Sequence, residues 1–248
     1  MQNFSPTPTF RRGAVQPVVC IQTGWELIKQ RFWFFVGMSA LAVIIGSMVP
    51  FGILLGPLTC GIYLTLFHLR RNQPIEFGLL FKGFDYFGDS VVATLIHYVP
   101  LVVVILPFYV VLYAGMFLMM PRQGGEPDPA SLFGFLALLI VMMLVIFTLA
   151  MVVSIIFTFS YPLIVDRKMS GVDAVRASAK AAIANFVPLL GLSLLNGILM
   201  FIGVLLCYVG MFLAMPIYFA AIETAYEQVF GLAEAQAPNL PPPPPMFT

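Results

Sequence analysis

Residues 129–165 read PASLFGFLALLIVMMLVIFTLAMVVSIIFTFSYPLIV, a run of 37 residues that contains no Asp, Glu, Lys or Arg. An α-helix needs about 20 apolar residues to cross the hydrocarbon core of a bilayer. The run is long for one crossing and short for a hairpin of two. It therefore predicts one transmembrane helix, whose surplus residues continue beyond the bilayer or are absorbed by tilt.

Three further charge-free runs lie at 32–69, 90–121 and 181–222, with lengths of 38, 32 and 42 residues. The first is long enough for two helices and has a natural break at Val-Pro-Phe-Gly, residues 49–52, because proline removes a backbone donor and glycine relaxes the chain. The last is also long enough for two, with 203–210 as its best turn. The predicted paired helices are 32–49, 52–69, 186–203 and 208–226. Six crossings follow, with five or four as alternatives if either pair is re-entrant.

The composition agrees with this class. Hydrophobic residues make up 60% of the 248-residue chain and charged residues only 9%, whereas a soluble domain carries about 25% charged residues. A soluble monomer is therefore excluded, and the predicted fold class is an all-α polytopic transmembrane bundle. The net charge of +1 gives no reason to infer a nucleic-acid partner.

The basic residues predict the orientation. Six crossings place eleven of the twelve on one side, namely Arg11, Arg12, Lys29, Arg31, Arg70, Arg71, Lys82, Arg167, Lys168, Arg176 and Lys180. Arg122 alone falls on the other side. Because cytoplasmic loops carry the excess of Lys and Arg, both termini are expected in the cytoplasm of a cell with this protein in its inner membrane. The first 31 residues contain no apolar segment typical of a cleaved signal peptide.

Three amphipathic segments precede the paired or single crossings, at 17–30, 74–87 and 170–184. Such segments are typical of helices that lie in the membrane interface, with long basic side chains that reach the headgroups. Lys82, Arg176 and Lys180 are the predicted headgroup contacts. The succession of interfacial, outward and return helix suggests a threefold internal repeat, and convergent membrane chemistry is the alternative.

One cytoplasmic stretch, residues 161–178, reads YPLIVDRKMSGVDAVRAS, and residues 71–87 look like a variant of the same module. In layout the chain resembles uncharacterised six-helix bacterial inner-membrane proteins over about residues 20–230. These include the membrane domain attached to some glycerophosphodiester phosphodiesterases. The resemblance implies a six-helix bacterial inner-membrane fold, and it implies no activity.

Polar residues inside apolar runs are the default functional candidates, and His97, Asn196 and Glu223 are the main ones. His97 suits either a proton relay or a hydrogen bond between helices. Asn196 is expected to hydrogen-bond across helices, and Glu223 is expected at the cytoplasmic boundary, where a carboxylate costs little. Prolines suggest broken helices of the kind that build transporter sites, with a kinked but inert bundle as the alternative: Pro100, Pro107, Pro162, Pro188 and Pro216.

No hydrolase, phosphate-binding, dinucleotide or zinc motif is present, and Cys20, Cys60 and Cys207 lack metal-ligand or redox spacing. We therefore expect no catalytic residues, no metal and no cofactor. The predicted organisation is a disordered tail (1–15), one membrane domain (16–230) and a Pro-rich disordered tail (231–248). We expect a non-enzymatic scaffold or accessory subunit, and the alternative is a small-solute or lipid transporter. An intramembrane enzyme would need a catalytic cluster that is not found. The expected partners are the lipid bilayer and other membrane proteins or a second copy of the chain.

Overall fold

The computed structural model describes residues 8–48, 52–118, 128–206 and 208–233. Within these ranges every regular element is a helix, and the predicted all-α class is confirmed. Several predictions fall partly or wholly outside the described residues. They concern the two terminal tails, the break at 49–51, the loop that carries Arg122, and Cys207.

The long apolar helices confirm the polytopic membrane class. Among the described residues, five helical stretches are long and apolar enough to cross a membrane, namely Pro17–Ser47, Gly78–Phe117, Pro129–Arg167, Phe186–Leu205 and Val209–Phe230. The predicted crossing at 52–69 corresponds to α3 (Leu55–Arg70), which follows α2 (Phe32–Ser47). Helix α3 is 16 residues long, which is shorter than the usual length of a crossing. Six crossings therefore stays a prediction.

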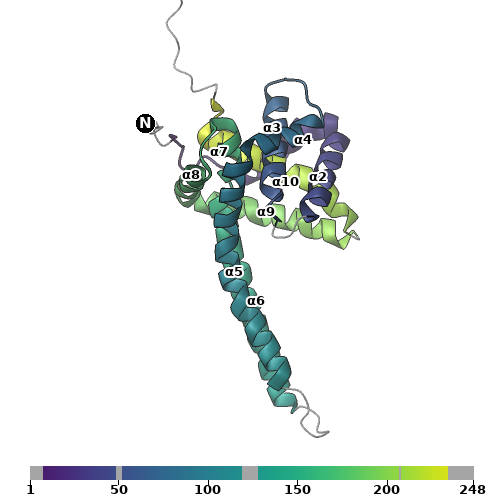
Figure 1. The fold of residues 1–248 in the computed structure, drawn as a ribbon, viewed down its shortest axis with the longest axis vertical. Helices are drawn as coiled ribbons and strands as arrows, with labels where there is room; N and C mark the ends of the chain where they lie inside the picture. Colours follow the sequence, from purple (N-terminus) through teal and green to yellow (C-terminus); the bar gives the residue numbers. More distant parts are fainter. Residues whose placement is uncertain (1–7, 49–51, 119–127, 207, 234–248) are drawn as a thin grey trace, which may run out of the picture.

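Helices α5 (Phe87–Leu118) and α6 (Pro129–Phe157) form a long hairpin that projects from the rest of the molecule (Figure 1). Helix α6 begins with Pro129 after Asp128, whose carboxylate accepts a hydrogen bond from the Ser131 N–H at 3.2 Å. In the two stretches that form the hairpin, Gly78–Phe117 and Pro129–Arg167, the 18-residue window that meets the criteria for a membrane span contains no buried residue. In these windows the side chains are exposed or half-buried, as expected of helices that contact lipid.

Several helices pack against α10 (Val209–Phe230), and Tyr226 and Phe230 of α10 are among the largest fully buried side chains. Helix α1 (Pro17–Ile28) runs along it closely, because Gly24 has no side chain: a Cβ there would lie 2.8 Å from the backbone N of Ala221. Helices α2 and α3 contact α10 as well. One face of α1, with Cys20, Gly24 and Ile28, is therefore buried against this core.

The predicted turn at 203–210 is confirmed. Helix α9 (Phe186–Leu205) ends and α10 begins, at Val209, within this range. Tyr208 turns the chain with a left-handed φ of 62°. Gly203 and Gly210 face each other so closely that a Cβ on Gly203 would lie 2.8 Å from the Gly210 carbonyl carbon. The two glycines thus allow the two backbones to meet at the start of the hairpin.

The candidate helix breaks separate into two groups. Helix α5 continues through Pro100 and Pro107, and α10 continues through Pro216, contrary to the expectation of broken helices there. Pro162 lies four residues after Thr158, where α6 ends before α7 (Ser160–Arg167). Pro188 likewise follows the end of α8 (Gly171–Ala184) by four residues. A proline cannot donate to the carbonyl four residues before it, so a helix end at that carbonyl is the expected consequence.

The three segments expected at the interface are helical: α1, the pair α4 (Gly78–Lys82) with a 3-10 turn (Gly83–Tyr86), and α8. Helix α8 begins with a cap, in which the Ser170 hydroxyl accepts from the Asp173 N–H at 3.3 Å. Whether they lie in a membrane interface, and whether they descend from one repeat, stay predictions.

Candidate functional site

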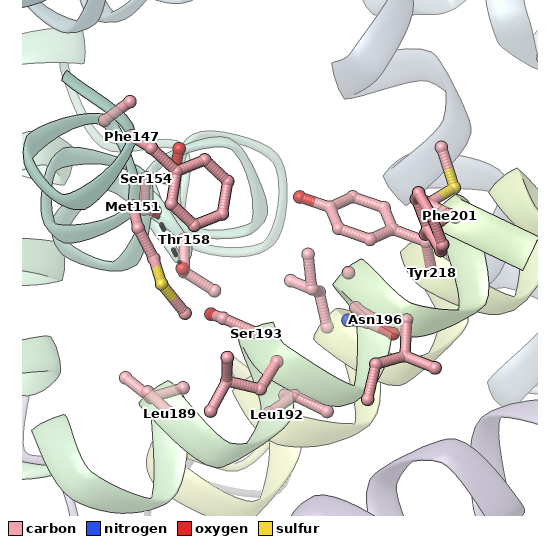
Figure 2. Close-up of a pocket in the computed structure, with 16 residues that line it drawn as sticks. Phe147, Met151, Ser154, Thr158, Leu189, Leu192, Ser193, Asn196, Phe201 and Tyr218 are labelled. Atoms are coloured by element: carbon pink, nitrogen blue, oxygen red, sulfur yellow. Dashed lines mark hydrogen bonds between the residues drawn. The ribbon is translucent and has the colours of Figure 1, made fainter. Parts of the chain in front are cut away.

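A cavity of about 630 Å³ lies between α6, α9 and α10 (Figure 2). Its wall consists of the inner half of α6, the middle of α9 and two residues of α10. The lining residues are Phe147, Ala150, Met151, Ser154, Thr158, Leu189, Leu192, Ser193, Leu194, Asn196, Gly197, Ile198, Met200, Phe201, Tyr218 and Ile222. None of the sixteen carries a charge, so the cavity suits an uncharged and mainly apolar occupant.

Four of the residues that line the cavity are exposed on the apolar surface of the candidate spans, and we take the opening of the cavity, its mouth, to lie between them. Phe147 of α6 is 68% exposed and Phe201 of α9 is 63% exposed. Leu194 and Ile198 of α9 are also exposed. In a bilayer these side chains would face the acyl chains, and the cavity would open sideways into the lipid.

Asn196 is the polar group that the wall leaves unsatisfied. Its side chain is only 3% exposed, and its Oδ1 has no hydrogen-bond partner. A buried acceptor without a partner costs about 1–3 kcal/mol. The hydroxyl of Thr158 is already used, because it donates to the Ser154 carbonyl at 2.9 Å. Tyr218 and Ser193 bring hydroxyl groups into the same space (Figure 2). The cavity wall is thus apolar apart from a few uncharged polar side chains.

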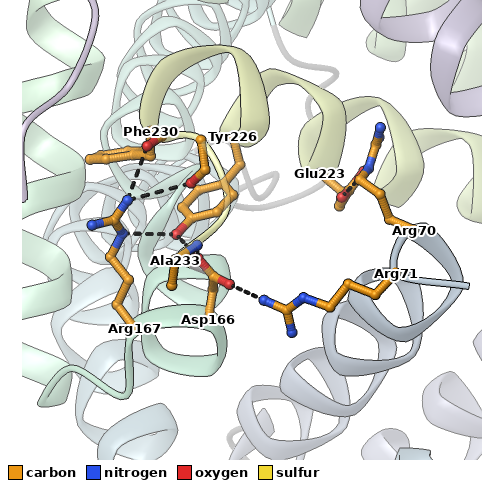
Figure 3. A network of polar contacts seen from close by, with 9 residues as sticks. Arg70, Arg71, Asp166, Arg167, Glu223, Tyr226, Phe230 and Ala233 are labelled. Atoms are coloured by element: carbon orange, nitrogen blue, oxygen red, sulfur yellow. Dashed lines mark hydrogen bonds and ion pairs between the residues drawn. The ribbon is translucent and has the colours of Figure 1, made fainter. Parts of the chain in front are cut away.

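A second feature is a buried ion pair between α3 and α10 (Figure 3). Arg70 donates from Nε to Glu223 Oε1 at 2.7 Å and from Nη2 to Glu223 Oε2 at 2.5 Å. The same guanidinium donates to the Thr224 hydroxyl at 3.0 Å and pairs with Glu227 at 2.6 Å. The Glu223 side chain is 0% exposed, so the carboxylate does not have the low cost expected of a boundary position. Arg70, 153 positions away in sequence, compensates the burial of this charge.

A neighbouring network joins α7 to α3 and α10 (Figure 3). The buried Asp166 carboxylate accepts from Arg71 at 2.8 Å and from the Tyr226 hydroxyl at 2.8 Å. Arg167 donates to the Tyr226 oxygen at 3.3 Å and to the Phe230 carbonyl at 3.0 Å. Since each group satisfies another on a different helix, the network fixes the three helices relative to one another.

His97 lies outside the cavity lining. Its ring stacks on Phe157 with centroids 4.7 Å apart and on Tyr98 at 6.0 Å. Nearby, one hydrogen bond of 3.0 Å joins the Thr94 and Tyr161 hydroxyls. The structure therefore does not bring His97 together with Asn196 or Glu223, and its recorded contacts are those of helix packing.

The predicted headgroup residues occupy three different settings. Lys82 lies 3.9 Å from Glu76, and Arg176 lies 3.8 Å from Asp173. These acidic neighbours offset part of each positive charge. Lys180 lines a groove with Arg12, Phe10 and Ile183. Asn185 holds the N-terminal segment beside this groove, because its side chain accepts from the Ala14 N–H and donates to the Arg11 carbonyl, both at 3.1 Å.

Sequence reasoning missed the network residues Arg70, Arg71, Asp166, Arg167 and Tyr226. In the sequence, Arg70, Arg71 and Arg167 indicate only the cytoplasmic side, and no pattern singles out Asp166 or Tyr226. A usable signal was present, because Glu223 follows a long apolar run and a buried carboxylate needs a cationic partner. No group of three or more His, Cys, Asp or Glu that could hold a metal ion is found among the described residues.

Comparison with known proteins places the chain in no family. No protein-family model matches it, and neither a curated protein nor a solved structure is significantly similar to it.

Proposed function

We propose that the protein is a multi-pass membrane protein that binds a lipid-like molecule in the cavity between α6, α9 and α10. The observation that carries the proposal is the cavity itself, with its volume of about 630 Å³, its uncharged wall and its mouth among exposed apolar side chains. Small-molecule sites commonly have volumes of about 300–1,000 Å³ and mostly apolar walls.

The position of the mouth decides what kind of molecule can enter. A polar solute would have to leave water and cross the exposed surface formed by Phe147, Ile198 and Phe201. A lipid already dissolved in the bilayer meets no such barrier. Contact with the wall then replaces contact with neighbouring acyl chains, and the shape and polar groups of the cavity provide the selectivity.

The proposal is a form of the lipid-transporter alternative, restricted to binding. It assigns no enzymatic step to the cavity. It includes the predicted setting, a bacterial inner membrane with both termini in the cytoplasm. The distribution of basic residues supports this orientation.

The test uses a glycine that the cavity leaves open. Gly197 lines the cavity, and a Cβ built on it meets nothing within 4 Å. Gly197→Trp should therefore fill the space without displacing the backbone. Gly134→Trp is the matched control, since Gly134 lies on α6, is also open and is not part of the lining.

Protein in nanodiscs would be irradiated with a C16 alkyl probe that carries a diazirine in its chain. Labelled peptides would then be located by mass spectrometry. We expect labelling at 147–158 and 189–201, reduced roughly tenfold in Gly197→Trp and unchanged in Gly134→Trp. Equal labelling of all three proteins at these segments would refute the binding site.

A second candidate function, a scaffold or accessory subunit, is favoured by the projecting α5–α6 hairpin. Its exposed apolar surface suits a partner helix as well as lipid. Val141 is 57% exposed on α6. A photoreactive maleimide on Val141→Cys, activated in native membranes, should give a protein adduct or a dimer of the chain if the hairpin docks a partner. Adducts with lipid alone would contradict this second function.

A further inference from the structure

A groove of about 460 Å³ lies between the N-terminal segment (residues 8–16) and the C-terminal end of α8. Its lining residues are Phe10, Arg12, Lys180, Ile183 and Ala184. We infer that this groove binds an anionic phospholipid, with the headgroup phosphate between Arg12 and Lys180 and an acyl chain against Ile183. The inference does not depend on the proposed function, because the groove shares no lining residue with the cavity between α6, α9 and α10.

The backbone of the N-terminal segment is fixed beside α8, which places Arg12 at the groove. The Arg11 N–H donates to the Val229 carbonyl at 2.8 Å, and the Arg11 carbonyl accepts from the Asn185 side chain at 3.1 Å. The same side chain, which belongs to a residue only 1% exposed, accepts from the Ala14 N–H at 3.1 Å. Arg12 lies between these two anchored positions, and it is exposed. A fixed stretch of backbone therefore presents this guanidinium to the groove.

The two cations of the groove have no acidic partner within the described residues. Arg176, one turn before Lys180 on α8, lies 3.8 Å from Asp173. Neither Arg12 nor Lys180 forms an ion pair with any carboxylate in the described part of the chain. Two like charges that line one groove repel each other, and a phosphate between them removes this repulsion and accepts charge-assisted hydrogen bonds from both. The charge of the groove therefore favours an anionic group.

The apolar part of the groove indicates a lipid rather than a free phosphate ion. Ile183 is 67% exposed in the last turn of α8, and Val187, four residues later, is 77% exposed. Between these two residues the chain passes from α8 into α9, a candidate membrane span. A span that begins here places the groove at the depth where lipid phosphates lie next to the start of their acyl chains. The phosphate and the chain of one lipid would thus each meet a matching group.

The test is native mass spectrometry of the full chain in detergent, titrated separately with dioleoyl phosphatidylglycerol and dioleoyl phosphatidylcholine. The two lipids have the same chains and the same phosphate, but the choline cation cancels the phosphate charge. We expect the wild type to bind phosphatidylglycerol about tenfold more tightly. The double variant Arg12→Gln/Lys180→Gln should lose this preference, because each basic residue near an anionic lipid contributes about a fivefold factor in affinity.

Lys29→Gln/Arg31→Gln is the matched control. It also removes one Lys and one Arg, and both side chains are exposed and lie outside the groove. We expect it to keep the preference for phosphatidylglycerol. An equal loss in both double variants would show that the total charge attracts the lipid, and it would overturn the site. Thermal unfolding checks the fold of each variant. If the groove double variant is unfolded, then Arg12→Gln and Lys180→Gln are tested singly, each with an expected loss of about fivefold.

The apolar contact distinguishes a bound lipid from a bound phosphate ion. Ile183→Ser should weaken binding of phosphatidylglycerol about threefold. Val172→Ser should not, since Val172 is exposed on the same helix but does not line the groove. Inorganic phosphate at the concentration of the lipid should not displace it, and displacement would overturn the assignment to a lipid.

The outcome for Gly197→Trp separates this site from the proposed function. This variant changes the cavity between α6, α9 and α10, so it should keep the wild-type preference for phosphatidylglycerol even if the cavity binds no lipid. A preference that disappears in Gly197→Trp and persists in Arg12→Gln/Lys180→Gln would place the anionic lipid in the cavity and overturn the inference.

Discussion

Arg70 and Glu223, 153 positions apart, meet in a two-point ion pair in which the guanidinium Nε and Nη2 donate to the two carboxylate oxygens at 2.7 and 2.5 Å. The pair ties the end of α3 to the last third of α10, where the carboxylate is fully buried. The bidentate geometry makes this pair strong compared with a surface ion pair, because two charge-assisted hydrogen bonds form without water between them.

Glu223→Gln should destabilise the protein by about 2 kcal/mol, because the charge-assisted bonds from Arg70 are weakened while the shape of the side chain is retained. Glu227 limits the loss, since it stays paired with the same guanidinium at 2.6 Å. The measurement is the free energy of unfolding in mixed micelles, followed by circular dichroism during titration with SDS.

The matched control is Glu26→Gln. Glu26 pairs with Lys29 three residues away, and its side chain is 60% exposed. Exposed pairs of this kind contribute less than about 0.5 kcal/mol. Equal effects of the two substitutions would show that burial of the Arg70–Glu223 pair does not matter for stability.

Tyr226→Phe removes one hydroxyl from the network around Asp166. That hydroxyl donates to the buried Asp166 carboxylate at 2.8 Å and accepts from Arg167 at 3.3 Å. Because the carboxylate loses a donor that water cannot replace, we expect a loss of about 1–2 kcal/mol in the free energy of unfolding. Tyr109→Phe is the control, since Tyr109 is 50% exposed on the hairpin. An unchanged free energy for Tyr226→Phe would mean that the Asp166 network carries no net stabilisation.

The charge-free runs predicted the positions of the helices closely. The predicted helix at 32–49 corresponds to Phe32–Ser47, and the pair at 186–203 and 208–226 corresponds to Phe186–Leu205 and Val209–Phe230. These elements could be predicted because helix length and apolar composition are local properties, and because Gly203 and Gly210 mark a turn.

The partners of the polar residues could not be predicted in the same way. Asn196 stood out in the sequence as a polar residue in an apolar run, but its unmet Oδ1 depends on where α6 and α10 lie. Arg70 and Glu223 looked like two separate boundary charges. Their pairing depends on how α3 packs against α10, a relationship between distant segments that a local pattern does not contain.

The close packing of α1 on α10 leads to a third prediction. A Cβ on Gly24 would lie 2.8 Å from the backbone of both Ala220 and Ala221, so neither neighbour can move aside like a flexible side chain. Gly24→Ala should therefore push the two helices apart and destabilise the protein by about 1–3 kcal/mol.

Gly134→Ala is the control, for which we expect the opposite effect on stability. Gly134 lies inside α6, and a Cβ there meets nothing within 4 Å. Alanine in an exposed helix interior is favoured over glycine by up to about 1 kcal/mol, so this variant should be neutral or more stable. The thermal unfolding midpoints of both variants in the same detergent would check the prediction. A stable Gly24→Ala protein would show that α1 does not depend on this contact.

The topology gives the last prediction. Asn72 follows α3 in the basic cluster that begins with Arg70 and Arg71, whereas Gln123 belongs to the loop between α5 and α6 and lies outside the described residues. If 52–69 and 90–121 each cross the membrane once, then Asn72→Cys and Gln123→Cys lie on opposite faces. In intact cells a membrane-impermeant maleimide should label Gln123→Cys at once and Asn72→Cys only after the membrane is permeabilised. Cys20 and Cys60 are buried, so they should contribute little background. The parent chain and a Cys207→Ser background provide the controls. Labelling of both sites from the same side would refute the crossing between them and, with it, the placement of the basic residues on the cytoplasmic face.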